Sequence, residues 1–119
     1  MVKSFMEKIP RNISNIIDEF ILGVNKILGN RIKKIILYGS YARGDFNKSS
    51  DIDIMILTDL SNIEIEEYNE KIVDLAYDIE WNNNFDIDLS PLVINIEVFK
   101  HWLKAIPFYM NVQKEGVEL

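Results

Sequence analysis

The sequence predicts an α/β (α+β) fold, in which a small mixed β-sheet carries helices packed mainly on one face. Two long stretches have apolar residues at helical spacing, and three shorter stretches are apolar enough for buried strands. They alternate in the order helix, strand, strand, helix, strand, helix. The chain has 119 residues, 48% of them apolar, which suits one ordinary core, and no linker-like stretch interrupts it. We therefore expect a single domain over residues 1–119.

The first predicted element is an amphipathic helix over residues 12–29. Its apolar residues recur every three or four positions, the spacing of one helical face, and a glycine and an asparagine then provide a stop signal. Such a stripe is typical of core packing. Residues 33–38 (KKIILY) follow as a short apolar strand that ends at Gly39. Residues 40–50 are polar and rich in turn formers, and we expect one helical turn at their start.

A second strand, a second helix and a third strand come next. Residues 51–58 (DIDIMILT) are the second strand. Ser61 and Glu64 form a capping-box pattern at the start of a helix that continues to about residue 80. Residues 85–95 (FDIDLSPLVIN) are the third strand, and Pro91 inside it predicts an edge position or a bulge. A short helix from residue 97 to about residue 105, and one more helical piece after a proline, close the chain.

Composition and charge exclude several classes of site. The chain has no cysteine and a single histidine, so a metal here must be held by oxygen, which indicates magnesium, manganese or calcium. The net charge of −6 argues against non-specific nucleic-acid binding. No apolar run approaches the roughly 18 residues of a membrane span, and the N-terminus lacks the apolar core of a signal peptide. We expect a cytoplasmic protein.

Two acidic residues, Asp51 and Asp53, open the second predicted strand. Alternate strand residues share a face, so the two carboxylates lie side by side, about 7 Å apart along the strand. Like charges at this range repel unless a cation neutralises them, and magnesium is commonly held by one or two carboxylates plus phosphate oxygens. Taken alone, the pair fits a solvated strand entrance better. A second acidic pair, Asp86 and Asp88, would converge with the first if the two strands are neighbours.

The segment Gly39-Ser40 follows a strand and precedes the expected helical turn. Glycine allows a phosphate to approach the backbone, and free N–H groups with a serine hydroxyl suit an anion. Arg43 would add positive charge there or pair with Asp45. By itself, the segment fits a simple capped turn equally well, and it is not a P-loop. Taken together with the carboxylates of Asp51 and Asp53, however, it predicts a site for phosphates bridged by a cation.

At these residues the chain resembles the minimal nucleotidyltransferase (MNT) group of the polymerase-beta-like nucleotidyltransferases. Gly39-Ser40 within GSYARGD, followed by Asp51-Ile52-Asp53 within SDIDI, is the motif that carries the resemblance, which extends over residues 33–119. It implies a nucleotidyltransferase palm, ATP as the substrate and Mg²⁺ as the cofactor, with two ions expected and Mn²⁺ as an alternative.

The resemblance also implies roles for individual residues. Asp51 and Asp53 become catalytic metal ligands, and Gly39 and Ser40 become the turn that binds the triphosphate. The flanking Arg43 and Ser50 are further candidates for nucleotide binding. The family pattern includes a third carboxylate, both catalytic and a metal ligand, that activates the acceptor. Asp88 is the first choice and Asp86 the alternative, because the sequence leaves the register of the third strand open.

Many MNT proteins are antitoxins paired with a HEPN-domain ribonuclease toxin, and some transfer AMP to a tyrosine of that toxin. The resemblance thus implies a Mg²⁺-dependent protein adenylyltransferase that acts as an antitoxin. One alternative is a catalytically silent antitoxin that neutralises its toxin by binding alone. Another is a nucleotidyltransferase acting on a small molecule such as an aminoglycoside, for which the chain has room only if it forms a homodimer. The oligomeric state, homo- or hetero-oligomer, stays open.

Aromatic residues cluster near the C-terminus. Trp102, Phe108, Tyr109 and Met110 either seal the core or form a partner surface, and core packing is the simpler interpretation.

Overall fold

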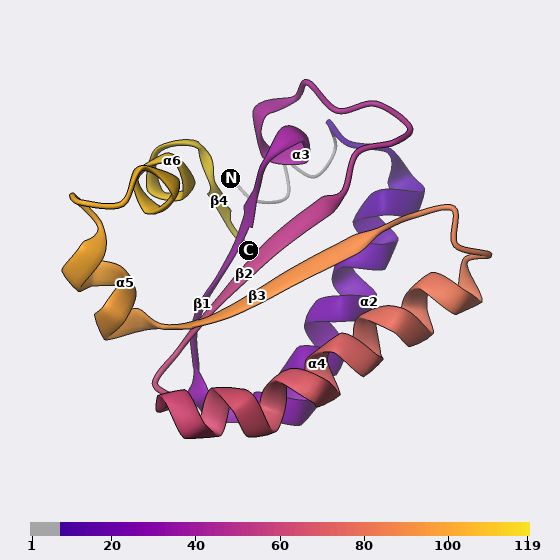
Figure 1. Cartoon of the computed structure of the whole chain (residues 1–119). Coiled ribbons are helices and arrows are strands. Elements are labelled where there is room, and N and C mark those ends of the chain that lie inside the picture. Colours follow the sequence, from indigo (N-terminus) through magenta and orange to yellow (C-terminus); the bar gives the residue numbers. More distant parts are fainter. Residues whose placement is uncertain (1–7) are drawn as a thin grey trace.

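The computed structural model describes residues 8–119, and residues 1–7 of the predicted domain lie outside this part of the chain. Its centre is a four-stranded sheet in the order β3-β2-β1-β4 (Figure 1). β1 pairs antiparallel with β2 and with β4, whereas β2 and β3 are parallel, so the predicted mixed sheet is confirmed. The strands are β1 (Ile32–Tyr38), β2 (Ile52–Thr58), β3 (Leu89–Asn95) and β4 (Val117–Glu118).

The two long helices cover one face of the sheet (Figure 1). Ile17 and Phe20 of α2 and Ile72 of α4 are fully buried, in one cluster with the alternate β2 residues Ile52 and Ile54. The apolar residues of the helices recur every 3.6 positions, and those of β2 recur every second position. Both patterns were visible in the sequence because both sets of residues are buried in this cluster. The helical elements are α2 (Arg11–Leu28), η1 (Gly29–Arg31), α3 (Ser40–Arg43), α4 (Asn62–Asn82), α5 (Ile96–Trp102) and α6 (Pro107–Glu115).

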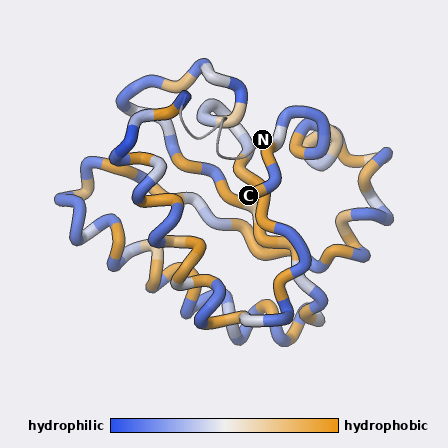
Figure 2. The backbone as a smooth tube through the Cα atoms, turned by 180° about the vertical axis from the view of Figure 1, so that it is seen from behind, coloured by the Kyte–Doolittle hydropathy of each residue, from blue (hydrophilic) through white to orange (hydrophobic). Residues whose placement is uncertain are grey.

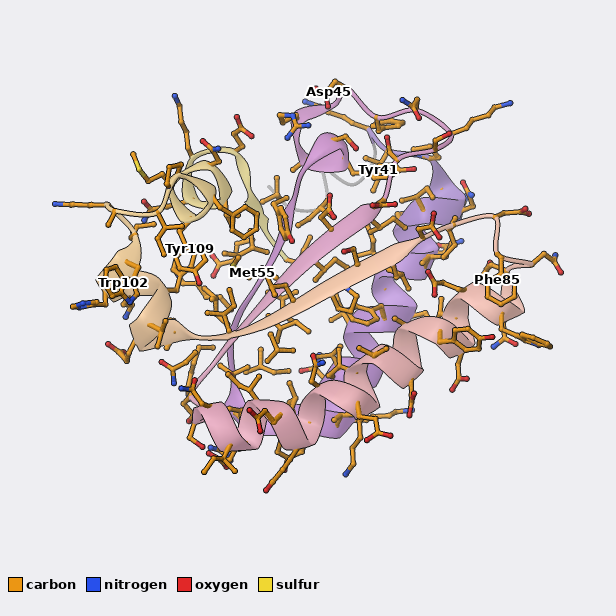
Figure 3. The ribbon with its side chains drawn as sticks, viewed as in Figure 1. Tyr41, Asp45, Met55, Phe85, Trp102 and Tyr109 are labelled. Atoms are coloured by element: carbon orange, nitrogen blue, oxygen red, sulfur yellow. The ribbon has the colours of Figure 1, made fainter. Side chains whose placement is uncertain are left out.

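The two short helices α5 and α6 lie on the other face. Met55 and Leu57 of β2 are buried there with Phe99 of α5 and Val112 of α6. Figure 3 shows Met55 on the same side of the sheet as Tyr109, which packs against this second cluster. Helices therefore lie mainly, but not only, on one face. Figure 2 shows apolar strands in the centre and polar residues along the outside of the helices.

The third strand starts later than expected. It was predicted over residues 85–95, but β3 begins at Leu89, and the preceding segment is a loop. The backbone of Asn84 and Phe85 has positive φ values of 58° and 56°, which end α4 in a tight turn and are incompatible with an extended strand. The alternation in FDIDL resembles a strand pattern, yet Asp86 and Asp88 do not lie on a strand face. The edge position predicted from the proline is confirmed, since β3 is an outer strand.

The start of α4 is fixed by hydrogen bonds that the capping-box pattern predicted. The Ser61 hydroxyl accepts from the Glu64 N–H at 3.3 Å, and the Glu64 carboxylate accepts from the Ser61 N–H at 3.1 Å. Arg31 donates to both Glu64 oxygens, at 2.9 and 3.1 Å, and to Asp59 at 2.6 Å. These bonds lower the pKa of Glu64 from its ordinary 4.5 to about 2, the largest cause being Arg31. The network joins the start of β1 to the start of α4.

Among residues 8–119, no helix is both long and apolar enough to cross a membrane.

Candidate active site

Gly39 joins the end of β1 to α3 in a conformation that favours glycine. Its φ and ψ are 76° and −156°, a region that residues with a β carbon rarely enter. A β carbon added here would overlap Oδ2 of Asp53. The glycine therefore serves two purposes: it permits the turn, and it lets the Asp53 carboxylate lie directly against the backbone.

The turn and the carboxylate pair share one cavity of about 360 Å³. Asp53 lies opposite Tyr38 in the antiparallel pairing of β1 with β2, which brings the ends of the two strands together. The cavity is lined by Tyr38, Gly39, Ser40, Arg43, Asp51 and Asp53 from the first half of the chain, and by Phe108, Asn111, Val112 and Glu115 from α6. The structure thus brings together five residues that the sequence singled out.

The cavity is unfavourable for uncompensated negative charge. Burial raises the pKa of Asp53, and the neighbouring Asp51 carboxylate raises it further, while Arg43 acts in the opposite direction. The pKa of Tyr38 is raised to about 12, first by burial and second by the negative charge of Asp53. A cation between the two carboxylates would remove this cost.

Arg43 takes both of the roles left open by the sequence. It lines the cavity, and its Nε donates to Asp45 at 3.2 Å. Its Nη1 also lies 3.6 Å from a carboxylate oxygen of Glu115 on α6. Arg43 therefore links the turn to α6 across the cavity.

The donor set fits a hard divalent cation. The cavity lining offers the carboxylate oxygens of Asp51 and Asp53 and includes neither histidine nor cysteine, which suits Mg²⁺ or Mn²⁺. Within residues 8–119, no three or more acidic, histidine or cysteine residues form a group that could enclose a metal ion. Two carboxylates would need water and phosphate oxygens to complete the coordination, and this is how magnesium is usually held beside a nucleotide.

Three other candidate residues lie elsewhere. Ser50, Asp86 and Asp88 line a neighbouring cavity of about 620 Å³ beyond α3. The Ser50 hydroxyl accepts from the Asn47 N–H at 2.8 Å, a turn contact. The Asp88 carbonyl accepts from the Ile52 N–H at 2.8 Å, so its backbone is adjacent to Asp51, although residue 88 is part of the lining of the other cavity.

Sequence reasoning missed the contribution of α6. Phe108, Asn111, Val112 and Glu115 follow an i, i+3, i+4, i+7 spacing, which places them on one helical face. That spacing was visible, but nothing in it indicates that this face meets the carboxylates of β2. Phe108, expected to seal the core, lies instead on the cavity wall and is 41% exposed.

The chain is similar in sequence to known nucleotidyltransferases. The family model described as "Nucleotidyltransferase domain" matches residues 17–112. Two proteins of Methanocaldococcus jannaschii, both named "Putative protein adenylyltransferase", are each 33% identical, over 90% and 88% of this chain and 98% and 95% of their own lengths. "Protein adenylyltransferase MntA" of Thermococcus cleftensis is 29% identical, over 57% of this chain and 74% of its own.

Two solved structures also match part of the chain. A crystal structure of a mutant MntA–HpeT toxin–antitoxin matches with a TM-score of 0.46 and 22% identity, over 82% of this chain and 68% of the matched chain. A crystal structure of a toxin–antitoxin with AMP-PNP matches with a TM-score of 0.47 and 23% identity, over 83% and 68%.

Proposed function

The chain belongs to the nucleotidyltransferase domain family, and from this premise we propose that it is an adenylyltransferase that moves AMP from ATP to a hydroxyl group of a partner protein. The observation that carries the proposal is the contact between Gly39 and the Asp53 carboxylate. It joins a turn suited to phosphates and a carboxylate pair suited to a cation in one cavity. Neither motif alone distinguishes a nucleotide site from an ordinary turn or strand entrance.

Within residues 8–119, the start of α3 supplies backbone donors for the triphosphate that bond to no other backbone group. The N–H groups of Ala42 and Arg43 bond to the Gly39 carbonyl at 3.1 and 3.0 Å, so those of Ser40 and Tyr41 precede the first bonds of α3. With the Ser40 hydroxyl they form the donor set that we assign to the phosphates. When bound, Mg²⁺ held by Asp51 and Asp53 would neutralise charge on the triphosphate.

The proposed reaction transfers AMP from ATP to the acceptor hydroxyl. The acceptor hydroxyl oxygen bonds to the α-phosphorus of ATP, the bond from that phosphorus to the bridging oxygen breaks, and pyrophosphate leaves. The hydroxyl proton goes to a carboxylate, which we assign to Asp88. The backbone position of residue 88 beside Asp51 supports this assignment, which requires the Asp88 carboxylate to point toward the site. Asp86, in the preceding loop, is the alternative.

Several observations support a protein acceptor. The M. jannaschii relatives and the T. cleftensis protein are named protein adenylyltransferases. The MNT resemblance suggests a HEPN-domain toxin as the partner, with a tyrosine as the acceptor in a hetero-oligomeric complex. A net charge of −6 would steer association with a basic, RNA-cleaving protein. The proposal places the protein in the cytoplasm, where its donor ATP is available.

The test uses as candidate partner the protein encoded by the gene next to that of this chain. The two proteins are incubated with ATP and Mg²⁺, and the partner is weighed by mass spectrometry. We expect a mass increase of one or more AMP units that is absent with Asp51→Asn. A tight complex with no added mass, together with full neutralisation of the partner by Asp51→Asn, would favour an antitoxin that acts by binding alone.

A further inference from the structure

We propose that α6 forms the base-binding wall of the cavity, with Phe108 stacking on the adenine of the donor nucleotide and Asn111 hydrogen-bonding to its edge. This inference rests on the proposed function, since it assigns the part of the site that holds the base rather than the phosphates. Figure 1 shows α3 and α6 beside the same end of β1. The cavity between them is lined at one side by the turn and at the other by α6.

Phe108 has the position of a stacking residue. Phe108 is 41% exposed although it lines a cavity that also contains three acidic residues, Asp51, Asp53 and Glu115. An edge contact with Tyr38, with ring centroids 5.5 Å apart and planes at 79°, holds it on the wall. An aromatic ring left open in a polar cavity gains little from its surroundings, whereas stacking against a nucleobase buries it.

Asn111 lies one helical turn further along the same face. It is exposed to the cavity, and its side-chain amide has no hydrogen-bond partner within residues 8–119. A carboxamide offers one acceptor and two donor hydrogens. These match the N6 amino donor and the N7 acceptor that lie side by side on one edge of adenine. On the same edge guanine presents two acceptors, O6 and N7, which a carboxamide cannot match with one donor and one acceptor, so Asn111 would favour ATP over GTP.

The helix that carries both residues is firmly anchored. Val112, between them and the sheet, is 2% exposed and packs with Ile36 and Met55. At the far end of the helix, Glu115 approaches Arg43 of α3. The wall is therefore held in place before any nucleotide binds, which lowers the ordering cost of binding. A volume of about 360 Å³ also lies within the usual range of small-molecule sites, roughly 300–1,000 Å³.

The experiment separates the base from the phosphates. Binding of Mg²⁺-ATP and of Mg²⁺-tripolyphosphate, which has no base, is measured by calorimetry for the full chain and for Phe108→Ala. We expect the Kd for ATP to rise about five- to hundredfold, the range for losing one base–aromatic stack, and that for tripolyphosphate to stay unchanged. Phe108→Tyr should bind ATP normally. Met110→Ala is the matched control, because Met110 is also exposed on α6 but does not line the cavity.

Asn111→Ala tests the edge contact by the ratio of ATP to GTP affinity, which should fall toward one. Equal weakening of ATP and tripolyphosphate by Phe108→Ala, or no weakening of either, would overturn the base wall and leave the proposed function standing. Normal ATP binding with loss of partner binding would instead identify Phe108 as a contact for the protein acceptor. Failure of the unaltered chain to bind Mg²⁺-ATP would count against the proposed function itself.

Discussion

The α carbon of Gly39 packs directly against the carboxylate of Asp53, so that no side chain fits between the turn and the strand. The contact joins the end of β1 to the start of β2, and it aligns the two halves of the candidate site. Because of this contact, the candidate site requires glycine at position 39 as strictly as it requires the carboxylate at position 53.

Replacing Gly39 by alanine should abolish transfer. The added β carbon overlaps Oδ2 of Asp53 and also forces alanine into a glycine-like conformation, which costs about 1–3 kcal/mol of stability. Gly44→Ala is the control, because Gly44 has φ of +90° but open space around it. It should lose about 1–2 kcal/mol of stability and keep its activity. Urea unfolding and the AMP-transfer assay measure the two effects. Comparable loss of activity in both variants would show that activity depends on the backbone conformation of the glycines rather than on the contact of Gly39 with Asp53.

Asp53→Asn should reduce transfer by at least about a hundredfold, as expected when a group that aligns charge in the transition state is lost. The fold should be retained, because the change relieves repulsion with Asp51 in the absence of cation. We expect a Tm, measured without divalent cation, at or above that of the unaltered chain. Asp78→Asn, on the exposed side of α4, changes the net charge equally and should leave activity intact. A large drop in Tm for Asp53→Asn alone would indicate a structural role.

ATP binding should require a divalent cation. Without it the triphosphate meets the carboxylates of Asp51 and Asp53, and each close uncompensated charge pair costs a few kcal/mol, so affinity in EDTA should fall about tenfold or more. Calorimetry with Mg²⁺, Mn²⁺ and EDTA provides the measurement. In the double variant Asp51→Asn/Asp53→Asn, the remaining affinity should no longer depend on the cation. Equal affinity of the unaltered chain with Mg²⁺ and with EDTA would contradict a cation bridge.

Asp88→Asn should slow transfer at saturating ATP more than it weakens ATP binding, because a proton acceptor acts in the transition state. Asp86→Asn is the comparison, since Asp86 lines the same neighbouring cavity from a position two residues further from β3. Single-turnover rates and Kd values for both variants decide between them. The larger kinetic effect in Asp86→Asn would transfer the role to that residue, and no effect in either would leave a two-carboxylate site.

The ion pair between Arg31 and Glu64 should make stability depend on pH. The pKa of Glu64 is lowered to about 2 in the folded chain, so its contribution is complete above the ordinary value of 4.5 and is lost as the pH falls toward 2. The difference in Tm between the unaltered chain and Glu64→Gln should therefore shrink over this interval. Glu66→Gln, a change of the same type at an exposed position of the same helix, is the control variant. Thermal unfolding followed by circular dichroism at several pH values is the check.

Much of this architecture was predictable because its signals are local. The helix around Ile17, the alternation of Ile52 and Ile54 in β2, and the cap formed by Ser61 each depend on spacing within a few residues. The start of β3 was mispredicted for the same reason. FDIDL alternates like a strand, but α4 runs on to Asn82 and its end takes up the following residues in a turn with positive φ.

The sequence by itself determined that a glycine-serine turn and two carboxylates on one strand face belong to this chain, since steric limits on φ and the two-residue period of a strand act between near neighbours. Only the tertiary structure decided that Gly39 touches Asp53, that Asp88 is part of the neighbouring cavity, and that the face of α6 bearing Phe108 lines the site. These relationships depend on how elements distant along the chain pack on the sheet. Such packing is driven by the burial of apolar surface, which does not depend on whether the buried residues are neighbours in the sequence.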